Sequence, residues 1–178
     1  CTGLGFLQKA DPELVIPDPS RSIWDGGIEA SGWNSVKSDS IARMYFEALA
    51  EKYHFSLQDP INKLPKAGLQ AILYGTGKEK LQLHYSRGNG RGTLEQPFEG
   101  VLPNLERRLR ETQSDAMRKE LESYMAAQPC PECHGDRLSE ISRAVTVGGM
   151  RIADFCRLPV TQALAFVNDL HLTGAQAM

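Results

Sequence analysis

The chain has 178 residues, of which 41% are hydrophobic, and a formal net charge of −2 at pH 7. This length suits one domain, or one domain with part of a neighbour, and the apolar fraction is sufficient for a core. The near-neutral charge excludes a global attraction to nucleic acid as the basis of function. No run approaches the ~18 apolar residues of a membrane helix, and no signal peptide opens the sequence, so no membrane partner is expected.

The first six residues, CTGLGF, have the pattern of the second half of a zinc knuckle, CxxCxGxG. On this interpretation the first cysteine of that knuckle lies three residues before Cys1. Zinc in a structural site takes four ligands. Cys1 therefore requires partners from elsewhere in the sequence.

Residues 7–37 are predicted to be extended and interrupted by turns. Pro12, Pro17 and Pro19 oppose a regular helix, and several glycines mark turns. Trp24 and Trp33 are interpreted mainly as packing residues of a segment that lacks a core of its own. The alternative is that they stack on bases at a nucleic-acid surface.

Two helices are predicted next. The first spans about residues 39–54, with Ser38 or Asp39 as its cap, because apolar residues recur there with a helical period. The second spans about residues 65–74 and ends at Gly75.

The stretch Gly75-Thr76-Gly77-Lys78 invites comparison with a phosphate-binding loop. A Walker loop needs G-x-x-x-x-G-K followed by Ser or Thr, whose hydroxyl binds magnesium. Here Lys78 is followed by Glu79, and a helix instead of a strand is predicted before the glycines. These glycines are interpreted as a helix stop and a turn, and no nucleotide site is predicted.

A β-hairpin is predicted because apolar and polar residues alternate over residues 80–85 and a second strand, over residues 93–98, can pair with them. The tip, RGNGRG, has Asn-Gly at its centre, which is typical of tight hairpin turns. Basic residues lie at the tip and at the base, and all are candidate phosphate contacts on a DNA-binding surface. They are Arg87, Arg91, Lys78 and Lys80.

Two further helices are predicted over residues 103–112 and 115–125, each with an inward apolar stripe. The basic residues that point away from these stripes are Arg107, Arg108, Arg110, Arg118 and Lys119. Two explanations stay open for them. They form ordinary surface ion pairs, because Glu106–Arg110, Asp115–Lys119 and Arg118–Glu122 are each four residues apart, or they contact DNA.

Between residues 75 and 110 basic side chains outnumber acidic ones, whereas the first sixty residues lean acidic. This asymmetry favours the later part of the chain as the side that faces a polyanion. The short link between the hairpin and the helix over 103–112 favours their packing side by side. The basic residues of the two elements would then form one surface.

The segment CPECHGDRL at residues 130–138 is typical of a zinc knuckle, with two thiolates on either side of a tight turn and a glycine that lets the backbone fold under the metal. We expect Cys130, Cys133 and Cys1 to be ligands of one Zn²⁺ ion. His134 would need a strained geometry to supply the fourth zinc ligand, because it directly follows Cys133. Cys156 is predicted to be a small buried residue and not a ligand. The knuckle makes a disulfide framework the weaker interpretation, which suits a reducing cytoplasm.

After the knuckle the sequence predicts a short strand over residues 144–147, a turn at Gly148-Gly149 and a helix over about residues 161–170.

The two half-knuckles together resemble the zinc module of the UvrA family, the damage-recognising ATPase subunits of bacterial nucleotide-excision repair. Two more stretches match that family, DPELVIPDP at residues 11–19 and PFEGVLPNLERR at residues 97–108. The resemblance implies an α+β fold, in which helices and a small antiparallel hairpin or sheet are inserted between two halves of a zinc knuckle. Residues 1–10 and 128–178 would form the base, and residues 11–127 the insertion domain.

The resemblance also implies a function. This chain would be a DNA-binding and regulatory domain without catalysis of its own, contributing to the discrimination of damaged from native double-stranded DNA. Its contacts would go to phosphates, because lesion recognition tolerates many base sequences and depends on deformability. ATP with Mg²⁺, the partner UvrB and a second UvrA copy would engage parts outside this chain.

Two other classes of function compete with this one. The first is a protein-interaction module of the chaperone zinc-knuckle type, which carries four closely spaced CxxCxGxG motifs, whereas here a long insert separates two. The second is a metalloenzyme, which is disfavoured because a catalytic zinc needs an open position beside a general base.

Overall fold

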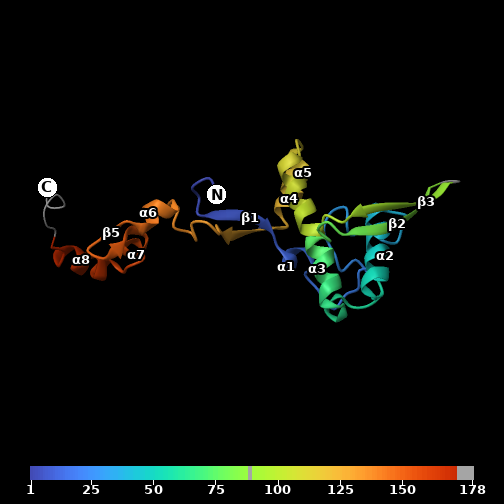
Figure 1. Ribbon diagram of the computed structural model, residues 1–178, viewed down its shortest axis with the longest axis horizontal. Coiled ribbons are helices and arrows are strands. Elements are labelled where there is room, and N and C mark those ends of the chain that lie inside the picture. The colour runs from blue at the N-terminus through green and yellow to red at the C-terminus, as the bar shows by residue number, and fades with distance from the viewer. Residues whose placement is uncertain (88–89, 172–178) are drawn as a thin grey trace. The chain divides into compact units, whose positions relative to one another are not determined.

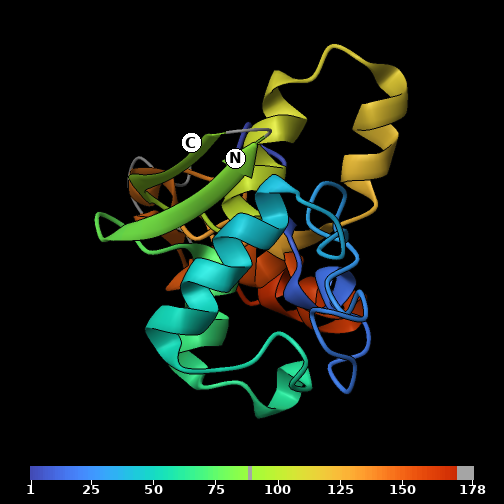
Figure 2. The same cartoon turned by 90° about the vertical axis from the view of Figure 1, so that its right-hand side faces the viewer.

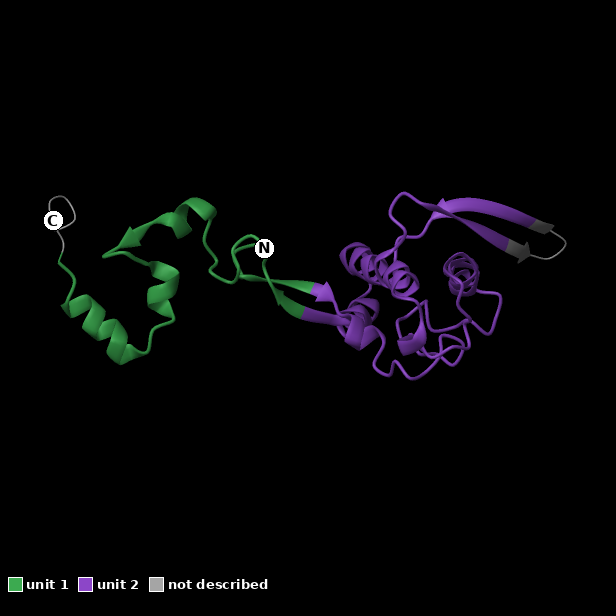
Figure 3. Ribbon diagram, turned by 60° about the horizontal axis from the view of Figure 1, so that its bottom comes forward, with its two compact units in different colours: residues 1–8, 127–178 green, residues 9–126 purple. Residues whose placement is uncertain are grey.

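The computed structural model describes residues 1–87 and 90–171, and it describes no side chains for residues 85–91. It divides into two compact units, one formed by residues 1–8 with 127–178 and the other by residues 9–126 (Figures 1 and 3). The fold is α+β, as predicted, with helices and two-stranded sheets that pair β1 with β4, β2 with β3 and β5 with β6.

The 9–126 unit opens with an irregular segment that is packed by its aromatic residues. A short helix, α1 (Pro12–Val15), begins there, because proline is tolerated at the first position of a helix; the prediction that Pro12 opposes a helix is wrong. Trp33 is buried, and its ring lies 5.7 Å from that of Phe46 and 5.3 Å from that of Phe98. The packing interpretation of Trp33 is therefore confirmed.

Two predicted helices follow, joined by the short 3-10 helix η1 (Ile61–Lys63). Helix α2 (Ile41–Tyr53) is capped by the Ser40 hydroxyl, which accepts from the Arg43 amide, and not by Ser38 or Asp39 as predicted; it ends at His54 in the left-handed conformation. Helix α3 (Lys66–Tyr74) ends at Gly75, as predicted.

The predicted hairpin consists of β2 (Lys80–Arg87) and β3 (Gly90–Pro97), which pair antiparallel; its Gly88-Asn89 tip lies outside the described residues. Leu81 and Leu83 are buried, and β2 packs mainly on α2 (Figure 2). The alternate residues of β2, Lys80, Gln82 and His84, are exposed. One face of the hairpin thus covers the core and the other meets solvent.

Helix α4 (Val101–Glu111) begins two residues earlier than predicted and packs mainly on α3 and α5. The main helix contact of the hairpin is with α2, so the predicted packing beside α4 is not one of its principal contacts. Helix α5 (Asp115–Glu122) ends before Met125, which instead begins the strand β4 (Met125–Pro129). β4 pairs with β1 (Phe6–Ala10), and neither strand was expected.

In the other unit, short elements follow the knuckle. They are α6 (Glu140–Ala144), β5 (Thr146–Val147), β6 (Met150–Arg151), α7 (Ile152–Cys156) and α8 (Val160–Asn168). Ala144 ends a helix, although a strand was predicted there, and Cys156 is exposed and not buried as predicted. Across residues 1–87 and 90–171, no helix is long and apolar enough to cross a membrane.

Candidate metal centre and nucleic-acid surface

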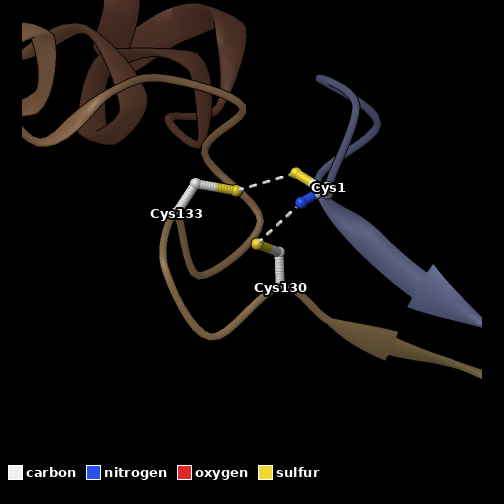
Figure 4. Close-up of side chains that lie close together, drawn as sticks. All are labelled: Cys1, Cys130 and Cys133. Carbon is white, nitrogen blue, oxygen red and sulfur yellow. Dashed lines mark hydrogen bonds between the residues drawn. The ribbon is translucent and has the colours of Figure 1, made fainter. Parts of the chain in front are cut away.

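Three thiols from opposite ends of the sequence lie together (Figure 4). The Sγ atoms of Cys1 and Cys133 are 3.7 Å apart, and those of Cys1, Cys130 and Cys133 all lie within 4.8 Å of one another. Cys130 and Cys133 are buried, whereas Cys1 is exposed. The structure thus brings together the three predicted metal-ligating residues.

The knuckle turn is formed by backbone hydrogen bonds. The His134 amide donates to the Cys130 carbonyl at 2.7 Å, and the Asp136 amide donates to the Cys133 carbonyl at 2.8 Å. Gly135 has a φ of 93°, a left-handed conformation that favours glycine. These bonds fold the chain back so that both sulfur atoms face the same side.

The two half-motifs meet through a glycine. A Cβ atom on Gly5 would lie 2.9 Å from the Gly135 carbonyl oxygen, so only glycine allows this approach without a shift. The Gly5 carbonyl also accepts a hydrogen bond from the Cys130 amide at 2.9 Å. Gly5, the second glycine of the CxGxG pattern, therefore lets the segment after Cys1 lie directly against the Cys130–Cys133 turn.

The local backbone favours the thiolate form of Cys130. The N–H groups of Cys133 and Glu132 point at its sulfur and lower the pKa of the thiol to about 7. A thiolate is the form that binds metal.

The arrangement fits a thiolate-preferring divalent cation. In a tetrahedron with Zn–S bonds of about 2.3 Å, neighbouring sulfur atoms lie roughly 3.8 Å apart. The 3.7 Å separation of Cys1 and Cys133 matches this edge. Among the described residues, the group with this geometry contains the three cysteines and not His134.

A buried carboxylate supports the knuckle and was not anticipated from the sequence. The Asp136 side chain is only 6% exposed and pairs with Arg157, which also contacts Asp154 at 3.4 Å. This contact joins the knuckle to α7. The only indication of this role in the sequence is that Asp136 directly follows the knuckle glycine, Gly135.

The nine predicted DNA-contact residues are in different environments. Arg107 is bound by two carboxylates, those of Glu99 at 2.8 Å and Glu111 at 2.8 Å. Its hydrogen bonds to Glu99 hold the pKa of that carboxyl below its ordinary value. The charge of Arg107 is thus balanced within the protein.

Arg108 connects three parts of the 9–126 unit. It donates to the Ser31 carbonyl at 2.6 Å, and another of its nitrogens lies 3.5 Å from the Met117 sulfur of α5. This arginine holds the 31–32 turn and α5 against α4.

The remaining basic residues of α4 and α5 are exposed. Arg118 donates to the Thr112 carbonyl at 3.1 Å, while Arg110 and Lys119 form no ion pair with any described residue. The predicted pairing of Glu106 with Arg110 is not formed, because Glu106 binds Lys9 at 3.1 Å.

At the base of the hairpin, Lys78 and Lys80 are exposed and pair with no carboxylate in the described part of the chain. Arg87 and Arg91 lie on the strands, with Arg91 opposite Ser86, and their side chains are outside the description. The predicted residues therefore fall into a hairpin group and an α4–α5 group.

Comparison with known proteins decides the family. The family described as "UvrA DNA-binding domain" matches residues 11–123. The chain belongs to the UvrA family. The matched residues nearly coincide with the 9–126 unit.

Relatives in the UvrA family extend the match beyond this unit. The chain is 39% identical over 173 residues to "UvrABC system protein A" of Clostridium perfringens and 40% identical over 178 residues to that of Xanthomonas axonopodis pv. citri. These matches cover 97% and 98% of this chain but only 18% and 17% of the relatives. The chain thus spans less than a fifth of their length.

A solved structure shows the same fold. UvrA2 from Deinococcus radiodurans matches with a TM-score of 0.63 and 21% sequence identity, covering 93% of this chain and 21% of that one. The α+β architecture is therefore that of UvrA.

Proposed function

We propose that this chain is the DNA-binding part of a UvrA-type protein and contributes to the discrimination of damaged from native duplex DNA in nucleotide-excision repair. The observation that carries the proposal is the match of a DNA-binding domain family to residues 11–123. The exposed basic residues of the hairpin and of α4–α5 supply charges for phosphate contacts.

The nine candidate contacts are not equivalent in this proposal. The residues without a carboxylate partner among the described residues are the stronger candidates, namely Lys78, Lys80, Arg110, Arg118 and Lys119. Arg87 and Arg91 stay candidates from their position on the hairpin strands. Arg107 and Arg108 contribute to DNA binding only if their present partners release them.

Zn²⁺ is the proposed ion of the three-thiol centre, because soft thiolate ligands favour zinc over the hard cations Mg²⁺ and Ca²⁺. When bound, zinc would join Cys1 to the Cys130–Cys133 turn and so fix the two ends of the inserted unit at one point. This role is structural and involves no reaction.

Catalysis and assembly belong to the rest of the protein in this proposal. The chain itself neither binds nor hydrolyses ATP, and UvrB and a second UvrA copy engage other parts in the cytoplasm. In the Gly75–Lys78 stretch the Thr76 hydroxyl is already used, since it donates to the Glu79 carbonyl at 2.7 Å and accepts from the Phe98 amide at 3.0 Å. The Thr76 hydroxyl thus stabilises a turn, and Glu79 occupies the position after Lys78 where a Walker loop has its magnesium-binding hydroxyl.

The test is a fluorescence-anisotropy titration of the chain with labelled duplex DNA at several salt concentrations. We expect weak binding with little sequence preference and a log–log salt slope of roughly −3, the value for about three phosphate contacts. A duplex of the same length and different sequence is the control. Absence of salt-sensitive binding would favour the alternative, a protein-interaction module.

A further inference from the structure

The Gly75–Lys78 stretch, which is not a phosphate-binding loop, forms the connection between α3 and β2. Helix α3 ends at Tyr74, and the next residues turn sharply into β2. Gly75 has a φ of 90°, and a Cβ atom there would lie 2.4 Å from the Glu99 carbonyl oxygen, so the turn is pressed against the start of α4. We call residues 74–80 the α3–β2 corner.

The corner is fixed by hydrogen bonds to the base of the hairpin. The Thr76 amide donates to the Phe98 carbonyl at 2.9 Å, and the Thr76 hydroxyl bonds both Glu79 and Phe98. A backbone held in this way loses little conformational entropy on binding.

The side chains that the corner exposes are aromatic and basic. Tyr74 is 53% exposed, although it follows the buried residues Ile72 and Leu73. Lys78 and Lys80 are exposed, and the one acidic residue of the corner, Glu79, is neutralised by Lys52 of α2 at 2.6 Å. The corner therefore combines an exposed ring with two positive charges.

We propose that the α3–β2 corner binds DNA at an unpaired base, with the Tyr74 ring stacked on the base and Lys78 and Lys80 on the flanking phosphates. Aromatic stacking is tolerant of base identity, because every base has a π-face. A base inside an intact duplex is not accessible to such a ring, so the contact forms where pairing is disrupted. The inference rests on the proposed DNA-binding function and extends it to a new residue, Tyr74.

The experiment compares two duplexes of one sequence, one fully paired and one with a short central run of mismatches, in titrations of the full chain. Tyr74→Ala is expected to weaken binding to the mismatched duplex roughly tenfold and to leave binding to the paired duplex unchanged. Tyr74→Phe keeps the ring and is expected to restore the wild-type preference. Lys78→Ala with Lys80→Ala is expected to weaken both and to reduce the salt slope by roughly 2.

Matched controls separate this effect from general surface changes. Ile41 is 70% exposed at the start of α2, so Ile41→Ala removes an exposed apolar side chain elsewhere in the same unit. The exposed Lys63 and Lys66 provide a charge-matched double alanine variant. Both controls are expected to bind both duplexes as the wild type does.

The outcomes distinguish the two proposals. If the wild-type chain binds neither duplex, the proposed function fails. If it binds both and Tyr74→Ala, with an unchanged circular dichroism spectrum, loses no affinity for the mismatched duplex or loses it equally for both, the stacking inference fails. Loss of preference with Tyr74→Phe would also overturn it, since the hydroxyl would then be the essential group.

Discussion

At the scale of single residues, the contacts of α4 separate side chains that look alike in the sequence. Arg107, Arg108 and Arg110 all point away from the leucine stripe of α4, which buries Leu102 and Leu105. Sequence periodicity identifies that stripe but not the partners of the outer face. On that face Arg107 pairs with Glu99, and Arg108 donates to the Ser31 carbonyl. Ser31 is distant from α4 in the sequence, so no local rule predicts its contact with Arg108.

Replacing these arginines one at a time should therefore give different losses of stability. Arg108→Ala removes a charge-assisted bond to the Ser31 carbonyl and should lower the free energy of unfolding by about 2 kcal/mol. Arg107→Ala removes an exposed pair that solvent screens, and its cost should be clearly smaller. Urea unfolding measures both, with exposed Arg110→Ala as the control. Equal losses for Arg107 and Arg108 would contradict the assignment of Arg108 as a structural connection.

The Arg107 contribution should also depend on pH. The pKa of Glu99 is lowered in the folded protein, so the stabilisation is complete above the unfolded-state pKa of about 4.3 and is lost as the pH falls through the lower folded pKa. The difference between wild type and Arg107→Ala should disappear at the acid end of a pH series of urea midpoints. A difference that grows on acidification would contradict this linkage.

At the scale of elements, Gly75 at the end of α3 and Gly100 at the start of α4 decide how closely these two helices approach. A Cβ atom on Gly100 would lie 2.5 Å from the Gly75 amide nitrogen, and Gly100 has a φ of 95°. Gly100→Ala should lower the free energy of unfolding by about 3 kcal/mol, from the clash together with the left-handed conformation. Gly77→Ala is the control, because that residue also has a positive φ, of 62°, but nothing within 4 Å of its Cβ, and it should cost about 1 kcal/mol. Thermal or urea unfolding compares them, and equal losses would exclude the clash as the cause.

Elements with local signals were predictable, and those with distant partners were not. Both α2 and α3 have a helical period, α2 has a serine cap and α3 stops at a glycine, and the hairpin has alternation with Asn-Gly at its tip. β1 and β4 are short, lack β-branched residues and pair across more than a hundred residues. Nothing local to either segment indicates the other strand. The early end of α5 has the same cause, since Met125 leaves the helix pattern to join that pairing.

The three-thiol cluster was predictable because its motifs are chemically specific. Cys1, Cys130 and Cys133 follow from knuckle spacing, whereas the support from Asp136 and Arg157 depends on where α7 lies in space. The environments of the basic residues were less predictable. Charged residues can be counted in the sequence. The pairing of Arg107 with Glu99 and of Glu79 with Lys52 is visible only in the structure.

Metal removal should affect the knuckle and leave the 9–126 unit folded. Both tryptophans, Trp24 and Trp33, belong to that unit, so their fluorescence reports its unfolding alone. Zinc that joins Cys1 to the Cys130–Cys133 turn restrains the unfolded chain, so chelation should release Zn²⁺ and lower the urea midpoint measured by fluorescence, while a single transition remains. Cys130→Ser should lower the zinc content and the midpoint in the same way. Loss of the transition on chelation would mean that the inserted unit needs the metal to fold.

At the scale of the whole molecule, the division into two units predicts that the core of one of them is self-sufficient. Its main buried cluster includes Phe46, Leu49, Ile72, Phe98 and Leu105, and every member of that cluster lies between residues 10 and 121. The ends of the unit are joined to that core, because the Asp11 amide donates to the Tyr124 carbonyl at 2.9 Å. A fragment of residues 9–126 therefore retains all the contacts of this cluster.

We expect the 9–126 fragment to fold cooperatively and to bind duplex DNA with the same salt slope as the full chain. Every candidate DNA contact, including Tyr74, lies within it, so removing the knuckle and the segments after it should remove no phosphate contact. Parallel anisotropy titrations of the fragment and the chain, each checked for a single urea transition by tryptophan fluorescence, measure this. A fragment with a Tyr74→Ala substitution serves as the control, because it should lose affinity for mismatched DNA as the full chain does. A folded fragment with a distinctly shallower slope would place part of the DNA contact in residues 1–8 or 127–178.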